Sequence, residues 1–363
     1  MSVGVLKGEE KIAFELRSLY KKYGYQPYKM SKFEEYDLYV NNKEFLLGDG
    51  VITFNDTDGR LLALKPDVTL SIIKNSVATA GKRKVYYNEN VYRISGETKQ
   101  FKEIAQAGLE CVGDIDEYDV FETVYLAAAS LAAISDNFVL DLSHAGILSA
   151  TLEEIGAGGD FDKAYLRLLS EKNRHEAAAL CEKYALSCEE KERLLTLLSV
   201  QGEAGKALEK LRPVCQGKAK EAFARLERLC KLLGVTEYAD KFRIDFSVVN
   251  NRNYYDDVVF KGFVDGIYEG VLSGGRYDLL LRRMGKDEGA IGFAVNLDLL
   301  EGFKETRHRK DVDILLLYDE NTPTLQLVRA VNALVKKGNS VSAQKTADGI
   351  RYKELVDMTG DKL

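Results

Sequence analysis

Two runs of sequence, KVYYNENVYRI at residues 84–94 and IAQAGLECVGD at residues 104–114, decide the expected fold. Both carry aliphatic and aromatic residues at the density typical of strands, and we predict that they pair as a hairpin. Their connection, SGETKQFKE at residues 95–103, is polar and long enough to be functional. The hairpin places Arg93, Gln106 and Glu110 on adjoining strands, although an isolated Arg–Glu pair across strands is usually structural.

Further strands and helices are predicted on both sides of this hairpin, from the periodicity of apolar residues and from turn-forming residues. Helices are expected at 9–23, 69–78 and 117–135, and strand-like segments at 25–40, 45–56, 59–66, 138–144, 243–255, 257–264 and 270–278. Residues 291–303 are expected to form a short strand and a helix. This mixture predicts an α+β fold.

The character of the chain changes in two places. Residues 148–239 are helical in pattern and interrupt a β-rich region, so we interpret them as an inserted helical subdomain between core segments 1–147 and 240–305. After a charged linker, residues 310–363 open with a β-α-β pattern and end about 20 residues later. This last part is predicted to be a partial α/β domain.

Composition excludes several classes of protein. The chain has 363 residues and a net charge of −6, which argues against a dominant nucleic-acid-binding surface. No apolar run approaches the roughly 20 residues that span a bilayer, and the N-terminus has no apolar signal core, so a cytoplasmic protein is expected. The cysteines are odd in number and form no C-x-x-C pair, which predicts buried, reduced thiols and no metal site. They are Cys111, Cys181, Cys188, Cys215 and Cys230.

Three other segments place polar residues in or beside predicted strands. Asp67 and Thr69 lie at a strand-to-helix turn, where an aspartate is most often a helix N-cap. SVVNNRNYYDDVVF at residues 247–260 carries asparagines and aspartates, which strands disfavour. GGRYD at residues 274–278 has paired glycines that would let backbone approach a ligand, but such a pattern is more often a bulge.

The order and spacing of these segments resemble the class II aminoacyl-tRNA synthetase core and, within it, histidyl-tRNA synthetase. The resemblance covers roughly residues 5–305. Ser31 stands where the proline of the first motif is expected, and Lys65 and Asp67 replace the arginine and glutamate of an L-R-P-E-x-T segment. The matching segments are FEEYDLY (33–39), LALKPDVT (62–69), VYRISGETKQFKEIAQAGLECVG (91–113), NRNYYDDVVF (251–260), GGRYD (274–278) and GFAVNLDLL (292–300).

The resemblance implies an antiparallel sheet flanked by helices, a helical insertion and a truncated C-terminal unit similar to an anticodon-binding domain. It also indicates that adenylation has been lost. Adenylation depends on fixed positive charge around the ATP phosphates. The second-motif arginine is kept as Arg93, but the arginine of the histidyl-specific segment falls on Asn250 and that of the third motif on Leu299. The loop GETKQFKE lacks the glycine–arginine pattern that grips ATP.

The amino-acid half of the pocket is better kept, and the resemblance implies a histidine-binding site. An acid for the ammonium group, with amide and phenol groups for the imidazole, suits a histidine-sized ligand. The alternative is that these residues persist only because they stabilise the fold. The candidates are Asp67, Thr69, Arg93, Gln106, Glu110, Tyr254, Tyr255, Arg276 and Tyr277.

A chain of this kind is similar to the ATP phosphoribosyltransferase regulatory subunits. The resemblance implies a non-catalytic protein without cofactor, dimeric through its core, that assembles with a short-form catalytic subunit and serves feedback inhibition by histidine. It implies neither membrane nor tRNA binding. A degenerate histidyl-tRNA synthetase and a stand-alone histidine- or RNA-binding paralogue are the alternatives. None of the three histidines is predicted to be catalytic; His144 is expected to pack or cap at a strand end, and His175 and His308 to be exposed.

Overall fold

The computed structural model describes residues 8–42, 50–75, 81–94, 99–249, 254–301, 303 and 311–359. The chain divides into two units, residues 7–303 and residues 304–363 with 1–6. Within the described ranges, no helix is both long and apolar enough to cross a membrane.

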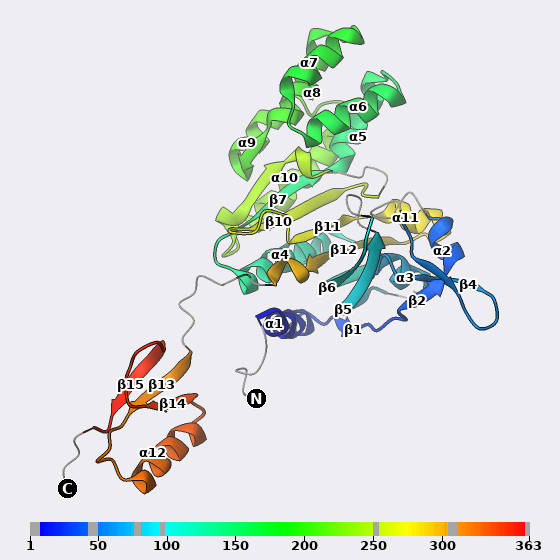
Figure 1. Ribbon diagram of the computed structural model, residues 1–363. Coiled ribbons are helices and arrows are strands. Elements are labelled where there is room, and N and C mark those ends of the chain that lie inside the picture. The colour runs from blue at the N-terminus through cyan, green and yellow to red at the C-terminus, as the bar shows by residue number, and fades with distance from the viewer. Residues whose placement is uncertain are drawn as a thin grey trace. The chain divides into compact units, whose positions relative to one another are not determined.

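A nine-stranded, mostly antiparallel sheet organises the larger unit (Figure 1). Among the described strands of this sheet, only the pairs β1–β5 and β7–β9 are parallel. This arrangement agrees with the predicted α+β class. In spatial order the strands are β1 (Gln26–Pro27), β5 (Arg83–Ile94), β6 (Phe101–Gly113), β12 (Gly289–Asn296), β11 (Leu272–Arg276), β10 (Val258–Val264), β7 (Phe138–His144), β9 (Phe242–Asp245) and β8 (Gln201–Glu203).

The predicted hairpin is confirmed as β5 and β6, which pair in antiparallel register with Glu89 opposite Gln106. Its connection is shorter than the nine residues predicted, because β6 already begins at Phe101. Residues 95–98 of that connection lie outside the described residues.

Successive side chains on a strand point to opposite faces of the sheet, and each face here has its own core. Leu109 and Cys111 of β6 point to the face covered by α1 (Gly8–Lys22) and α4 (Glu117–Ile134). Helix α4 begins with a capping box, in which Asp116 accepts from the Asp119 backbone N–H and Asp119 accepts from that of Asp116. This face carries the larger of the two apolar cores.

The opposite face is covered by a small antiparallel sheet and short helices. The small sheet has the order β2 (Phe33–Glu35), β4 (Leu61–Leu64), β3 (Thr53–Asn55). Val85 and Tyr87 of β5 point into the second core on this side. The helices are α2 (Tyr36–Val40), α3 (Thr69–Lys74) and α11 (Asp278–Arg283).

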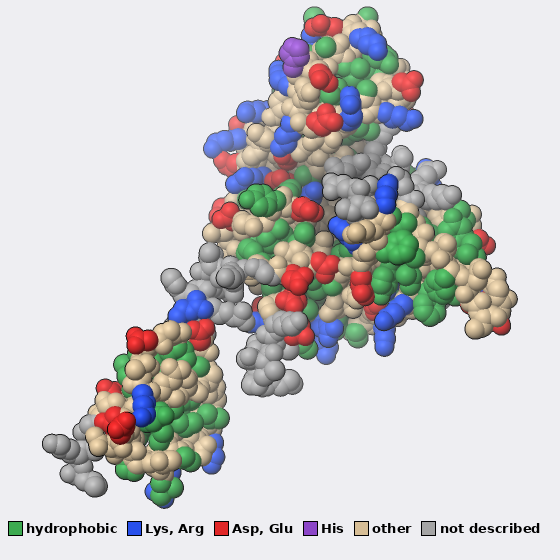
Figure 2. Space-filling model, viewed as in Figure 1, with side chains coloured by type: hydrophobic (Ala, Val, Ile, Leu, Met, Phe, Trp, Pro, Cys, Tyr) green, Lys and Arg blue, Asp and Glu red, His purple; other side chains and the backbone are tan. Residues whose placement is uncertain are grey.

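Helices gather at the β7–β9–β8 end of the large sheet, with charges of both signs spread over their surface (Figures 1 and 2). These helices account for most of residues 148–239, the range predicted as an inserted subdomain. The boundaries of that subdomain stay a prediction. Cys188 and His175 are exposed here, so the prediction of a buried thiol is wrong for Cys188. The helices are α5 (Ala145–Ile155), α6 (Gly159–Ser170), α7 (Arg174–Lys183), α8 (Cys188–Ser199), α9 (Ala204–Leu211) and α10 (Ala219–Leu233).

The described part of the smaller unit, residues 311–359, is a three-stranded parallel sheet with one helix, and its β-α-β opening was predicted. The sheet order is β14 (Val341–Gln344), β13 (Val312–Leu317), β15 (Tyr352–Asp357), and α12 spans Thr324–Lys336. Strand β15 was missed, because YKELVD has little apolar alternation. Ile314, Leu315 and Leu316 of the central strand form its buried part.

Three predicted elements differ from the structure. Residues 36–40 form helix α2 rather than a strand. The strand expected through residue 255 ends at Asp245, and a 3-10 turn follows at Phe246–Val248. After β12 the expected helix is a single 3-10 turn, Asp298–Leu300. In the second case Asp245 ends the strand by accepting from the Ser247 backbone N–H at 2.9 Å.

A buried ion pair ties the small sheet to the large one. Lys65, directly after β4, is fully buried, and its Nζ lies 2.8 Å from Glu89 Oε2 on β5. The Lys65 carbonyl also accepts from the Tyr92 backbone N–H at 2.8 Å. Because a buried ammonium without a partner is costly, this pair fixes where the chain enters the segment from Pro66 to Thr69.

We predict that Glu89→Ala lowers the free energy of unfolding by about 3 kcal/mol, because it leaves the Lys65 ammonium buried without its partner. Urea unfolding followed by circular dichroism measures the change. The control is Glu182→Ala, which removes the solvent-exposed pair with Lys191 and should change the free energy of unfolding far less. Equal losses in the two variants would contradict the assigned role of the buried pair.

Candidate functional site

A pocket opens on the α3 side of the large sheet, between β6, β11, β12 and α3. Eight of the nine candidate residues line it. Sequence reasoning missed the remaining lining residues, most of which are small or apolar. The full lining is Asp67, Val68, Thr69, Tyr87, Arg93, Gln106, Glu110, Tyr254, Tyr255, Ser273, Tyr277, Gly292, Phe293 and Ala294.

Glu110 is the buried carboxyl at the floor of the pocket, with only 2% of its surface exposed. Its Oε1 accepts from Thr69 Oγ1 at 2.8 Å, and its Oε2 accepts from the Tyr277 hydroxyl. Burial raises the pKa of Glu110 to about 8, against the opposing effect of these two hydrogen bonds. Burial thus favours the neutral acid, whereas the two donated hydrogen bonds favour the carboxylate.

Gly292 on β12 makes room for this carboxyl. A Cβ at that position would lie 1.7 Å from Glu110 Oε2, so any side chain there would displace the glutamate. The third-motif segment GFAVNLDLL thus keeps a glycine that serves the pocket. A glycine opposite a strand glutamate is the kind of signal that could have identified this position, had the strand pairing been known.

Asp67 both bonds to the start of α3 and lines the pocket. Its Oδ1 accepts from the Leu70 backbone N–H at 3.0 Å, so it caps the first turn of α3. The same carboxyl lines the pocket and is 8% exposed. Burial raises the pKa of Asp67, while the backbone hydrogen bond from Leu70 and the charge of Arg93 act in the opposite direction.

Three tyrosines form the aromatic wall of the pocket. The ring centroids of Tyr254 and Tyr255 are 4.6 Å apart, and those of Tyr254 and Tyr277 are 5.6 Å apart. Burial, followed by the nearby carboxyls, raises the pKa of each phenol, so all three stay protonated and can donate hydrogen bonds. Gly275 makes room for Tyr255, because a Cβ there would lie 2.6 Å from its ring.

The retained cation of the second motif is turned to the protein backbone. Arg93 Nε donates to the Pro66 carbonyl at 3.0 Å, and Arg93 is the only cation among the described residues that line the pocket. In the β5–β6 register it lies opposite Lys102, eight residues along β6 from Glu110. Gln106 lies on the same face of β6 as Glu110, four residues earlier, and also lines the pocket.

Arg276 is the candidate that does not line the pocket. It is the last residue of β11, whereas Tyr277 follows the strand, and only Tyr277 lines the pocket. Arg276 instead donates through Nε and a terminal nitrogen to Asp278, at 2.9 and 2.8 Å. Tyr254 and Tyr255 are also consecutive, but both line the pocket because they precede β10 and are not in regular strand.

Of the two positions predicted to have lost catalytic arginines, one lies within the described residues and the other outside them. Asn250 lies outside the described residues. Leu299 is half-buried in the 3-10 turn after β12 and does not line the pocket. His308 also lies outside the described residues, whereas His144 caps α5 by accepting from the Gly146 backbone N–H at 3.2 Å, which confirms the predicted capping role.

The pocket is small in this conformation, with a volume of about 50 Å³. At roughly 10–15 Å³ for each water molecule, it has room for only a few waters. An amino acid has several times more non-hydrogen atoms, so its binding requires the pocket to widen.

Two comparisons place the chain among known proteins. The family model for histidyl-tRNA synthetase matches residues 6–300. Over 95% of its length, the chain is 30% identical to the ATP phosphoribosyltransferase regulatory subunit of Caldanaerobacter subterraneus subsp. tengcongensis, covering 93% of that protein. It is 28% identical to the protein of the same description from Bacillus licheniformis, over 93% of this chain and 88% of the relative.

Solved structures give the same result for the fold. A structure described as an ATP phosphoribosyltransferase regulatory subunit/histidyl-tRNA synthetase from Bacillus halodurans aligns with a TM-score of 0.75 and 25% identity, over 97% of this chain and 94% of that one. A chain of the ATP phosphoribosyl transferase (HisG:HisZ) complex from Thermotoga maritima aligns with a TM-score of 0.63 and 19% identity, over 80% of this chain and 97% of that one. This protein, with its class II synthetase-like sheet and pocket, belongs to the ATP phosphoribosyltransferase regulatory subunit family.

Proposed function

We propose that this chain is a non-catalytic, histidine-binding subunit that activates a short-form ATP phosphoribosyltransferase and relays feedback inhibition by histidine. Its partner would catalyse the first step of histidine biosynthesis. The chain would form a homodimer through its synthetase-like core within a hetero-oligomer. The observation that carries the proposal is a pocket with two buried carboxyls, Asp67 and Glu110, beside three protonated tyrosines.

The composition of this pocket supports recognition of a cationic amino acid. Carboxyls can hold an ammonium or imidazolium group, and phenols and the Gln106 amide can bond to neutral imidazole nitrogens and to a carboxylate. The aromatic wall formed by Tyr254, Tyr255 and Tyr277 can pack against a flat ring. Histidine combines these groups in one small ligand.

The same pocket is poorly equipped for adenylation. Charge that develops on a reacting phosphate must be met by fixed cations, and each missing one typically costs about two to three orders of magnitude in rate. Arg93 is engaged with a backbone carbonyl, and Lys65 is buried against Glu89. The third-motif arginine position is Leu299. These features support a regulatory role over the alternative of a degenerate histidyl-tRNA synthetase.

Assembly with a catalytic subunit is proposed from the family and from the name of a similar structure. The solved Thermotoga maritima chain belongs to an ATP phosphoribosyl transferase (HisG:HisZ) complex. Histidine can regulate such a complex only if it binds its active and inactive states with different affinity.

We predict that Asp67→Asn weakens histidine binding by about tenfold or more, because it removes a charge from the pocket but keeps an oxygen that can cap α3. Isothermal titration of histidine into the full chain measures the affinity. In a complex reconstituted with a short-form catalytic subunit, the same variant should need correspondingly more histidine for inhibition. An unchanged affinity, or no binding to the wild-type chain, would contradict the proposed pocket.

We predict that histidine binding strengthens between pH 7 and pH 8. A cationic ligand favours ionised Glu110, whose pKa of about 8 in the free pocket means that binding must release a proton below that pH. The gain is at most about tenfold for each pH unit. Titrations in buffers of different ionisation enthalpy measure the released proton. Glu110→Gln should abolish this part of the pH dependence; identical profiles for both proteins would show that Glu110 does not titrate with binding.

We predict that the pure protein does not catalyse ATP–pyrophosphate exchange with ATP, magnesium and histidine, because the fixed cations needed for adenylation are missing. A histidyl-tRNA synthetase at equal concentration serves as the positive control. Robust exchange would favour the synthetase alternative. Absence of exchange together with failure to co-purify with a catalytic subunit would favour the stand-alone paralogue.

A further inference from the structure

The chain segments that carry the pocket tyrosines also carry charged residues that face away from the pocket. Tyr255 is followed by Asp256 and Asp257, and Tyr277 is preceded by Arg276. None of these three charged residues lines the pocket. Asp257 and Arg276 instead line a separate cavity of about 120 Å³, which lies against helices α4 and α10.

These two segments are bonded to each other and must move together. The Asp256 backbone N–H donates to the Arg276 carbonyl, and the Asp278 backbone N–H donates to Asp256 Oδ1, both at 3.2 Å. The Tyr255 ring lies directly against Gly275. If ligand entry displaces Tyr255 or Tyr277, the aspartates Asp256 and Asp257 therefore move as well.

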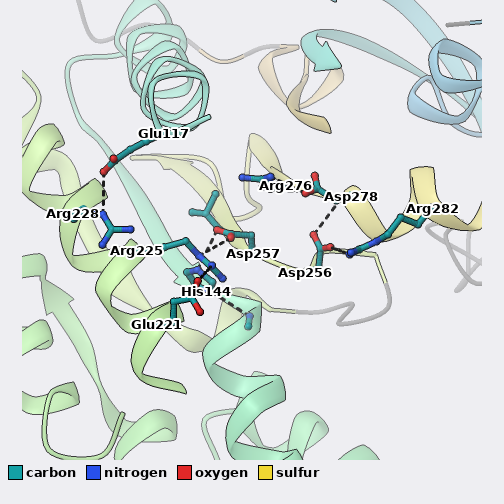
Figure 3. Close-up of polar contacts among 12 residues, drawn as sticks. Glu117, His144, Glu221, Arg225, Arg228, Asp256, Asp257, Arg276, Asp278 and Arg282 are labelled. Carbon is teal, nitrogen blue, oxygen red and sulfur yellow. Dashed lines mark hydrogen bonds and ion pairs between the residues drawn. The ribbon is translucent and has the colours of Figure 1, made fainter. Parts of the chain in front are cut away.

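Asp257 joins residues 254–257, the pocket segment, to helices α5 to α10, the helical segment (Figure 3). Its backbone carbonyl accepts from the Ala145 N–H at 2.7 Å, at the start of α5. Its Oδ2 lies 3.1 Å from Arg225 Nε on α10, and its Oδ1 lies 3.1 Å from His144 Nε2 at the end of β7. Asp257 thus contacts the end of β7 and helix α10 through its carboxylate, and the start of α5 through its backbone carbonyl.

The environment of Asp257 keeps it ionised. Burial alone would raise its pKa, but the hydrogen bond from His144 and the positive charges of Arg225 and Arg276 outweigh burial and hold the pKa well below its usual range. A partly buried carboxylate of this kind is stabilised by its cationic partners. Loss of Arg225 would therefore destabilise Asp257 and the pocket segment that carries it.

Arg225 is the residue of α10 that connects to the pocket segment. Helix α10 packs against α5 and α4, and it is the last helix of the helical segment. Arg228, three residues later, pairs with Glu117 of α4 at 3.3 Å, and both of those side chains are more than half exposed. The two arginines on one helix therefore contact different parts of the protein, and only Arg225 reaches the pocket segment.

We propose that the Arg225–Asp257 ion pair couples occupancy of the pocket to helix α10, so that the helical segment α5 to α10 responds when a ligand enters. The proposal rests on the histidine-binding function proposed above. The free pocket of about 50 Å³ must widen to admit an amino acid, and the aspartates move with the tyrosines that widen it. The ion pair favours the closed pocket, and ligand entry weakens it.

The test uses the full chain and two measurements: hydrogen–deuterium exchange of residues 219–233 with and without saturating histidine, and histidine affinity by titration calorimetry. In the wild-type protein, histidine should raise exchange in α10. Arg225→Gln should show raised exchange without histidine and no further response, and should bind histidine about three- to tenfold more tightly. Arg225→Lys should lie between, and the matched control Arg228→Gln should behave like the wild-type protein.

Three outcomes would overturn the coupling. They are histidine binding to the wild-type chain with no change in α10, a wild-type exchange response in Arg225→Gln, and an affinity of that variant within twofold of the wild-type value. Each leaves the proposed histidine pocket standing, whereas failure of the wild-type chain to bind histidine would remove both. If Arg225→Gln does not fold, the wild-type exchange experiment and Arg225→Lys still decide.

Discussion

The burial of the Glu110 carboxyl is the constraint on which the rest of the pocket depends. A carboxyl taken out of water must have its hydrogen bonds satisfied by the protein. Thr69 at the start of α3 and Tyr277 after β11 supply them, and Gly292 on β12 leaves the space. Elements far apart in the sequence are therefore held in one arrangement by a single side chain, and that arrangement defines the pocket.

The positive charges near the pocket are used for structure. Lys65 joins the small sheet to β5 through Glu89, and Arg93 holds the backbone at Pro66. Both contacts fix the segment that presents Asp67. In a pocket whose described cation is already engaged with backbone, a phosphate would find little compensation for its own desolvation, whereas an ammonium group would find two carboxyls.

The regular elements of the core could be predicted from sequence because their apolar patterns are strong. The β5–β6 hairpin, helix α4 and strand β7 are examples. Arg276 was assigned to the pocket because sequence does not show in which direction each of two consecutive polar residues points at the end of a strand. Tyr87 and Gly292 were missed for a different reason: the role of an aromatic or a glycine depends on the neighbour it faces, and only strand register supplies that neighbour.

The stretch from Tyr254 to Asp257 shows why a segment can be polar without being a solvated loop. It was expected to continue a strand, but β10 begins only at Val258. Because these residues are not in a regular strand, their side chains do not alternate between two faces. Both tyrosines line the pocket, and both aspartates contact arginines or His144. The aromatic pair serves one site and the acidic pair holds the surrounding elements, so the polarity of this stretch reflects two separate demands on adjacent residues.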